Sequence, residues 1–188
     1  WILGFTPGDV LIDVGANVGT YSMFAAVMRD AKVYAFEPEA QNFALLNRNI
    51  ALNEVSDHVV AWPLAISDEM RVSTLHVSSL HAGTSTHSFD EAVDFNLNDK
   101  TFEFSQGSVS VTLDSLIAQG TVPSPHHIKV DVGGFEHKVI AGAQTTLGDS
   151  TLRSILIELN PGIEAHRQLV ARMKAFGFAL DPEQVRRA

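Results

Sequence analysis

Two glycines four positions apart, Gly15 and Gly19, stand between an apolar run at 10–12 and a helical pattern that starts at Tyr21. Glycine has no Cβ and adopts backbone conformations closed to other residues, so the chain can turn tightly there and lie against a ligand. The N–H groups of the first helical turn are unpaired and point at whatever lies above the strand. The order of strand, glycines and helix therefore predicts a ligand-binding loop.

Two polar residues in this stretch indicate the kind of ligand. A dinucleotide loop would carry a third glycine in the pattern GxGxxG and would bind a pyrophosphate. Here Asn17 lies between the glycines and Asp13 precedes them. A carboxylate repels a phosphate, but it attracts a cationic amino group and accepts hydrogen bonds from ribose. S-adenosylmethionine has both features, so we expect Asp13, Gly15, Asn17 and Gly19 to hold its methionine end.

Glu37 supports a nucleoside ligand. It follows the strand-like run 32–36 and lies about 20 residues beyond the glycines, where a doubly wound fold holds ribose hydroxyls with an acid. We therefore predict that Glu37 binds the ribose. An NAD-dependent oxidoreductase would use the same kind of sheet, but the missing third glycine and the acid at Asp13 argue against it.

The composition excludes several classes of protein. The chain has 188 residues, a net charge of −9, a pI near 5.2 and no cysteine. Acidic charge without a cluster of Lys or Arg gives no attraction to a phosphate backbone, so we expect no nucleic-acid partner. No apolar run approaches the roughly 20 residues that span a bilayer, and no signal-peptide pattern is present. We expect a cytoplasmic protein without a membrane segment, although the chain begins at Trp1 rather than Met.

Apolar runs alternate with helical patterns along most of the chain. Strands are predicted at 10–14, 32–36, 59–62, 127–132 and 154–159, and helices at 20–29, 39–53, 135–147 and 163–176. This alternation is typical of a doubly wound α/β sheet, and we expect one domain over residues 1–188. A sixth strand is predicted to begin at 178–180. Residues 70–110 are irregular apart from short strands at 75–77 and 101–104, and we place the substrate side of the site near them.

Six stretches match the pattern of one family in its own order: LIDVGANVGTYS (11–22), VYAFEP (33–38), LNRNIALN (46–53), AISD (65–68), TLD (112–114) and IKVDV (128–132), which continues to Glu136. With them the chain resembles the FkbM family of S-adenosylmethionine-dependent methyltransferases over about residues 7–160. The resemblance implies the Rossmann-like sheet of class I methyltransferases, with strand order 3-2-1-4-5 and a further strand pair. It also implies methyl transfer, usually to a hydroxyl oxygen, and an adenine site at Ile66, Ser67 and Asp68. The alternative for the last two is a turn that caps local backbone.

Two departures from the family pattern bear on activity. The family usually has Asp-Val-Glu-Gly after the fourth strand, and here Gly133 replaces that Glu. If the missing carboxylate acts in catalysis, the protein is impaired or uses Glu136 instead. Class I sheets also end in an antiparallel strand pair, and this chain stops at about the first of the two. We therefore expect a sheet truncated at that pair.

The candidate catalytic residues follow the fourth predicted strand. Methyl transfer is an in-line displacement at a sulfonium carbon, so an enzyme mainly aligns the acceptor and removes its proton. A carboxylate or a histidine within hydrogen-bond reach can be that base. We predict Asp131 first, because it lies at the carboxyl end of a central strand, followed by Glu136 and His137. The alternative for Asp131 is a cap on the following helix. His81 and His87, in the irregular stretch, are weaker candidates.

A metal is the less favoured expectation. Asp131, Glu158 and Asn160 all lie at predicted strand ends, and oxygen ligands suit Mg²⁺. Catechol-type O-methyltransferases bring acids from comparable strand ends to one Mg²⁺. We nevertheless predict no metal, because Glu158 could equally lie inside its strand beside a buried donor. His166 is expected to be a core histidine, and His127 to lie on the surface.

The sequence therefore predicts an O-methyltransferase that acts on a small hydroxylated acceptor, a sugar or a natural-product intermediate. The alternative is a degenerate protein of the same fold that binds the nucleoside without turnover, weakened at Gly133 or by truncation. No motif identifies the acceptor, and nothing in the sequence gives the oligomeric state.

Overall fold

The structure is a computed structural model that describes residues 1–85 and 87–182. In chain order, its elements are η1 (Ile2–Gly4), β1 (Val10–Val14), α1 (Thr20–Arg29), β2 (Lys32–Phe36), α2 (Ala40–Leu52), β3 (Val59–Trp62), β4 (Ala65–Ile66), β5 (Arg71–Val77), β6 (Ser88–Phe89), β7 (Phe104–Val111), α3 (Leu113–Ala118), β8 (His127–Val130), α4 (Glu136–Ala141), α5 (Gln144–Leu147), β9 (Ser154–Ile157) and α6 (Glu164–Ala175).

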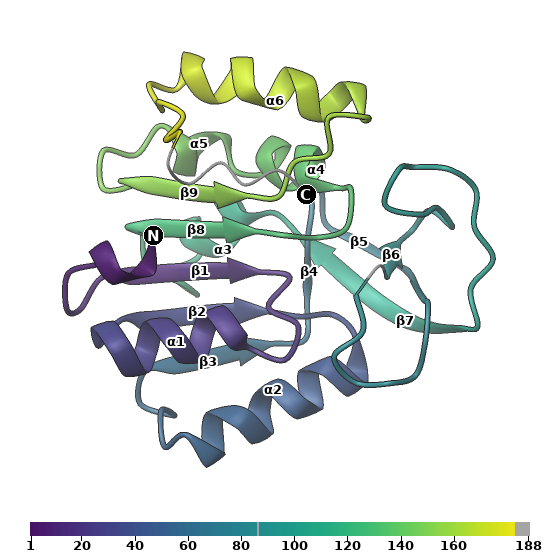
Figure 1. Cartoon of the computed structure of the whole chain (residues 1–188), viewed down its shortest axis with the longest axis horizontal. Coiled ribbons are helices and arrows are strands. Elements are labelled where there is room, and N and C mark those ends of the chain that lie inside the picture. The colour runs from purple at the N-terminus through teal and green to yellow at the C-terminus, as the bar shows by residue number, and fades with distance from the viewer. Residues whose placement is uncertain (86, 183–188) are drawn as a thin grey trace.

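The central sheet is parallel and has the order β3-β2-β1-β8-β9. This is the expected order 3-2-1-4-5, and the prediction of a doubly wound α/β sheet is confirmed. In Figure 1 the five strands point the same way, toward β5, β6 and β7. All the carboxyl ends of the parallel strands therefore face that part of the chain, which is where such sheets bind ligands.

Alternate residues of the central strands pack on opposite faces of the sheet. Leu11 belongs to a core cluster that includes Ala25 of α1 and Leu46 of α2. Ile12 belongs to a second cluster, with Leu113 of α3 and Leu169 of α6. Because both faces are covered, the central strands carry the nearly continuous apolar runs seen in the sequence.

A second, smaller sheet has the order β4-β7-β5-β6. β5 and β7 pair antiparallel from Arg71 opposite Ser110 to Val77 opposite Phe104. The strand predicted at 101–104 is therefore wrong except for its last residue, since β7 begins there and continues to Val111. We call residues 78–103, which join β5 to β7 and contain β6, the insertion.

The helix predicted over 135–147 is two helices, α4 and α5. A Cβ at Gly142 would lie 2.0 Å from the Ser67 carbonyl oxygen, so this backbone is pressed against the turn after β4. The Asp114 carboxylate accepts hydrogen bonds from the N–H groups of Thr145 and Thr146, at 2.9 Å each, and so caps α5 from another element. Both contacts come from distant parts of the chain, which explains why local periodicity missed the break.

The amino ends of the strands are closed by a polar cluster around His127. This residue is buried, so its expected surface position is wrong. Its ring stacks on Phe5 with centroids 3.7 Å apart, and its Nε2 lies 3.0 Å from Asp9 Oδ2. Its Nδ1 lies 2.8 Å from Ser154 Oγ at the start of β9.

Residues 178–180 form no strand, so the prediction of a sixth strand there is wrong. Within the described residues, β9 pairs with β8 alone and is the edge of the central sheet. None of the helices described here is long and apolar enough to cross a lipid bilayer.

Candidate functional site

The loop between β1 and α1 lies against the carboxyl end of β8. Gly15 has a φ of +73°, and a Cβ on it would lie 1.9 Å from the Asp131 carbonyl oxygen. Its N–H donates to the Phe36 carbonyl oxygen at 3.0 Å, which ties the loop to β2. Gly19 has a φ of +89°, and a Cβ there would lie 2.5 Å from Leu46 Cδ1. The backbone therefore requires glycine at both positions.

Glu37 closes the loop from the end of β2. Its side chain is buried, and its carboxylate accepts hydrogen bonds from the N–H groups of Asn17 at 2.8 Å and Glu39 at 2.9 Å. Burial raises the pKa of Glu37 to about 7. Glu37 and Asn17 both line the pocket described below. Asn17 Oδ1 is buried without a hydrogen-bond partner, so it has an acceptor free for a ligand.

Asp13 lies beneath the loop and is not part of the pocket wall. Its fully buried Oδ2 accepts a hydrogen bond from Ser22 Oγ at 2.6 Å, and its Oδ1 lies 3.3 Å from Lys129 Nζ. Lys129 in turn donates to the Gly15 carbonyl oxygen at 2.6 Å and lies 3.7 Å from Asp131 Oδ2. These contacts give Asp13 an indirect role, in which it fixes Lys129 and thereby the loop.

Ile66, at the end of β4, and Ser67 and Asp68, which follow it, lie on the wall of the same pocket. The Ser67 N–H donates to the Val111 carbonyl oxygen at 2.9 Å, and Ser67 Oγ donates to the Asp68 carboxylate at 3.0 Å. The local turn and the pocket wall are thus made by the same residues. The structure brings these three residues together with Glu37.

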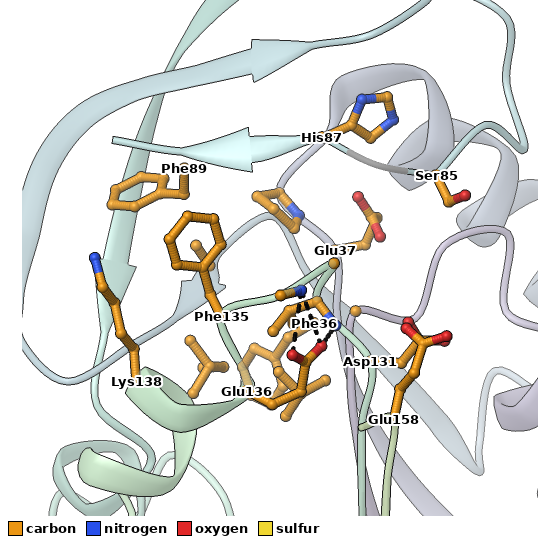
Figure 2. Close-up of a pocket in the computed structure, with 18 of the residues that line it drawn as sticks. Phe36, Glu37, Ser85, His87, Phe89, Asp131, Phe135, Glu136, Lys138 and Glu158 are labelled. Atoms are coloured by element: carbon orange, nitrogen blue, oxygen red, sulfur yellow. Dashed lines mark hydrogen bonds between the residues drawn. The ribbon is translucent and has the colours of Figure 1, made fainter. Parts of the chain in front are cut away.

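The pocket has a volume of about 990 Å³ and runs along the carboxyl ends of the central strands. Its wall includes the β1–α1 loop and Glu37, and also Asp131 and Glu158, which follow β8 and β9. Phe89, Phe135 and Lys138, labelled in Figure 2, also line it, and Lys138 Nζ lies 4.9 Å from the centroid of the Phe135 ring. The cavity therefore joins the predicted cofactor residues, except Asp13 and Gly19, to the first predicted catalytic residue.

Asp131 presents an exposed side chain to this pocket. No hydrogen bond from it caps α4 among the described residues. The N–H groups at that turn, those of Val132 and Gly134, donate instead to Glu136, at 2.8 and 3.1 Å. The exposed Asp131 carboxylate, which also lies 3.7 Å from Lys129 Nζ, can therefore contact a ligand.

Glu136 is almost completely buried and joins several segments. Besides those two N–H groups, its Oε2 lies 3.1 Å from Nε2 of the buried His166. His166 Nδ1 accepts a hydrogen bond from the Asn160 N–H at 3.0 Å, which fixes Nε2 as the protonated nitrogen. Burial raises the pKa of Glu136. These contacts suit a residue that positions the β8–α4 loop, and the expected core position of His166 is confirmed.

His137 lies outside the pocket wall. Its Nδ1 is buried without a hydrogen-bond partner, and its ring centroid is 5.9 Å from that of His166. Burial and the neighbouring His166 lower the pKa of His137. The structure therefore does not bring His137 together with Asp131.

Three carboxylates meet at the end of β8 and β9. Oxygen atoms of Asp131, Glu136 and Glu158 lie within 4.8 Å of one another, and Figure 2 shows Asp131 and Glu158 side by side. Burial and the adjacent Asp131 raise the pKa of Glu158 to about 7. Asn160, which the sequence grouped with the possible Mg²⁺ ligands, instead donates from Nδ2 to the Phe95 carbonyl oxygen at 3.3 Å.

The insertion covers one side of the pocket. The Thr84 carbonyl oxygen accepts hydrogen bonds from Asn17 Nδ2 at 3.2 Å and Asn42 Nδ2 at 3.0 Å. His87 lines the pocket, whereas His81 does not, and burial lowers the pKa of His87. The insertion therefore contacts both the β1–α1 loop and, through Phe95, the segment after β9.

Sequence reasoning missed Lys129 and the aromatic side chains Phe89 and Phe135. Lys129 had a signal, because it is a charged residue inside a strand whose other residues are apolar or buried. Phe89 had none, since it lies in the insertion, where no periodicity indicates which residues face inward.

Known proteins that are similar to this chain in sequence include methyltransferases. The hexuronic acid methyltransferase AglP of Haloferax volcanii is 28% identical over 159 residues, which cover 83% of this chain and 58% of AglP. The 31-O-demethyl-FK506 methyltransferase FkbM of Streptomyces tacrolimicus is 29% identical over 202 residues, covering 95% of this chain and 75% of that protein. The chain thus spans little more than half the length of the first relative.

A similar fold occurs in a solved structure. The precorrin-6y C5,15-methyltransferase of Geobacter metallireducens superposes with a TM-score of 0.54 over 95% of this chain and 68% of its own, at 12% identity. Residues 13–180 match the model of the methyltransferase FkbM domain. This match takes in the β1–α1 loop, Glu37 and the acids after β8 and β9, and the chain therefore belongs to the methyltransferase FkbM domain family.

Proposed function

We propose that this protein transfers a methyl group from S-adenosylmethionine to a hydroxyl oxygen of a small acceptor, such as a sugar or a natural-product intermediate. The observation that carries the proposal is that Glu37 and Asp131 line the same pocket, whose volume is about 990 Å³. A pocket of this size accommodates a nucleoside cofactor and a small acceptor together. The names of the two relatives, which specify a hexuronic acid and an FK506 precursor, support acceptors of this kind.

The residues present fit the cofactor. In our proposal Glu37 accepts hydrogen bonds from the ribose hydroxyls, and Ser67 and Asp68 lie at the adenine. Gly15, Asn17 and Gly19 bring the loop close to the methionine end, with the unpartnered Asn17 Oδ1 as an acceptor. Asp13 supports this loop through Lys129 rather than by contact. S-adenosylmethionine supplies an electrophilic methyl group when bound.

The acceptor side needs alignment and a base. Asp131 is exposed in the pocket, so it can accept the proton that the acceptor hydroxyl loses. Glu136 acts indirectly, because it holds the N–H groups of Val132 and Gly134 that shape the loop after Asp131. The insertion, which covers one side, limits access of water.

Calorimetric titration with S-adenosylhomocysteine, with NAD⁺ as the control ligand, tests the cofactor. We expect binding of the nucleoside product and none of NAD⁺. Glu37→Ala should weaken that binding by about 1–3 kcal/mol if it holds ribose hydroxyls. Glu103→Ala removes an exposed carboxylate outside the pocket and should leave the affinity unchanged. Binding of NAD⁺ alone would sink the proposal.

The alternative is a nucleoside-binding protein that does not turn over. Gly133, with a φ of +68°, stands where the family usually has a glutamate. The two functions separate in one experiment, because the alternative predicts binding of S-adenosylhomocysteine without methyl transfer to any acceptor. In that case Gly133→Glu should restore transfer if the lost carboxylate is the cause.

A further inference from the structure

The charges on the pocket wall are strongly unbalanced. Among the described residues that line it, carboxylates outnumber Lys and Arg side chains by eight to three. Glu37 and Glu158, whose pKa values are about 7, are only partly charged at neutral pH, but the other six carboxyl groups still outnumber the three cations. A ligand in this pocket therefore meets mainly negative charge. What matters for specificity is whether any of the three cations is available to bind an anion.

Two of the cations are neutralised by carboxylates beside them. Arg71 forms ion pairs with Glu69 and with Asp90, the latter at 3.0 Å. Lys138 pairs with Glu91, and its Nζ lies 4.9 Å from the centroid of the Phe135 ring. Both side chains bind acids that line the same pocket, so neither brings a net positive charge to a ligand.

Lys129 is occupied as well. Its ammonium is buried, donates to the Gly15 carbonyl oxygen at 2.6 Å, and lies 3.3 Å from Asp13 and 3.7 Å from Asp131. His87 adds no positive charge at neutral pH, because burial lowers its pKa below the usual histidine value. His166, the other histidine on the wall, is held by Asn160, Gly134 and Glu136. No described Lys, Arg or His on the wall is thus left to pair with an acidic substituent.

The carboxylates at the end of β8 and β9 are different. Glu158 is exposed, has Asp131 and Glu136 within 4.8 Å, and forms no ion pair among the described residues. Asp131 shares Lys129 with Asp13. An acceptor placed for proton transfer to Asp131 therefore lies beside at least one further acid. A like charge at this position is unfavourable, and hydroxyl or ammonium donors are favourable.

We propose that the acceptor is a ring alcohol that carries no anionic group, either neutral or bearing an amine, and that acceptors with a carboxylate or phosphate beside the reacting hydroxyl are rejected. This preference distinguishes the protein from its relative AglP, whose name specifies a hexuronic acid. The inference rests on the proposed methyltransferase function. Phe89 and Phe135 both line the pocket, and each offers an apolar surface to the face of such a ring (Figure 2).

Methyl transfer to matched acceptors tests the proposal. The probes are methyl glucoside, methyl glucosaminide and methyl glucuronide, together with cyclohexanol, 4-aminocyclohexanol and 4-hydroxycyclohexanecarboxylate. Each is incubated with the protein and S-adenosylmethionine, and the methylated product is measured by mass spectrometry. We expect transfer to at least one neutral or amino member, about tenfold or more faster than to its carboxylate counterpart. Preference for the carboxylate member overturns the proposal.

A charge reversal tests whether Glu158 causes the discrimination. Glu158→Lys should shift the rate ratio of carboxylate to neutral acceptor about tenfold toward the carboxylate, and Glu158→Gln should shift it by less. Asp57→Lys makes the same change in net charge at an exposed position outside the pocket and should leave the ratio unchanged. An unchanged ratio in Glu158→Lys overturns the assignment.

Titration with S-adenosylhomocysteine separates the two levels of failure. Without such binding the proposed function itself fails. With binding intact but no transfer to any of the six probes, the proposed class of acceptor is overturned. Gly133→Glu then tests the non-catalytic alternative, which predicts that this variant restores transfer.

Discussion

Replacing Gly15 by alanine tests whether the β1–α1 loop lies against β8 as described. The new Cβ would lie 1.9 Å from the Asp131 carbonyl oxygen, where ordinary contacts are 3.4–4 Å, so the loop or β8 must move. The left-handed φ of +73° adds about 1–2 kcal/mol of strain for a residue with a Cβ. Overpacking of this kind costs a further ~1–3 kcal/mol. We therefore expect a loss of about 2–5 kcal/mol in the free energy of unfolding.

Gly8→Ala is the matched control for that variant. Gly8 also has a left-handed φ, +84°, but a Cβ there meets no atom within 4 Å. Gly8→Ala should therefore lose only the stability that the strain costs, about 1–2 kcal/mol, and should keep the affinity for S-adenosylhomocysteine. Urea unfolding and calorimetric titration of both variants give the comparison. If Gly15→Ala is as stable as Gly8→Ala and binds the nucleoside like the parent protein, the close approach of the loop to Asp131 is refuted.

Three further perturbations follow from the structure. Glu136→Gln should lower the free energy of unfolding by about 1–3 kcal/mol, because an NH₂ group, which cannot accept a hydrogen bond, replaces one of the two oxygens that accept from Val132 and Gly134; a neutral result in urea would contradict its positioning role. Glu37 has a folded pKa of about 7 against 4.5 for a free side chain, so the unfolded state binds fewer protons between those values and stability falls as pH rises from 4.5 to 7. Between pH 5 and pH 8 the free energy of unfolding should therefore fall by about 3 kcal/mol more in the parent protein than in Glu37→Gln. An equal fall in both proteins would show that the pKa of Glu37 is not raised. Asp9→Asn should cost about 1–3 kcal/mol by weakening the contacts to His127 and Arg153, yet leave nucleoside affinity intact, because this cluster lies at the opposite ends of the strands; weaker binding would show that the two edges are coupled.

The pattern of apolar and polar residues was sufficient to predict the elements whose limits are set within their own segment. The strands at 10–14, 32–36 and 59–62 and the helix at 20–29 have the predicted limits. In each case an apolar run or stripe meets a glycine, proline or polar stop within the same segment. The family stretches then placed these elements in the correct sheet order, because parallel crossovers leave few alternatives.

The errors come from contacts between distant segments. Gly142 breaks a helix because its backbone meets Ser67, and Asp114 caps the second piece from α3. Likewise, β7 takes its length from pairing with β5, which its own alternation of residues does not specify. His127 reads as a surface residue until Asp9 and Ser154, far apart in the chain, supply partners for both ring nitrogens.

In the candidate site, too, some residues could be predicted from local sequence and others could not. The glycine loop, Glu37 and Asp131 were predicted because strand ends and glycine spacing have a direct physical meaning. The contacts of Glu136 could not be read, since an acid one turn after Asp131 looks the same whether it faces a ligand or folds back on the N–H groups of its own loop. Burial distinguishes the two cases, because Glu136 is 1% exposed while Asp131 lies open to the pocket.

Gly133 decides how the degenerate alternative should be weighed. Its φ of +68° and the +112° of Gly134 turn the chain sharply after β8, which brings Glu136 back beneath its own loop. A glutamate at 133 would have to adopt that left-handed conformation or change the turn, so the departure from the family concerns the backbone as well as a charge. The pocket nevertheless keeps two exposed carboxylates there, Asp131 and Glu158, within 4.8 Å of each other. Loss of one family carboxylate therefore does not leave the acceptor side without a base, and this favours turnover over binding alone.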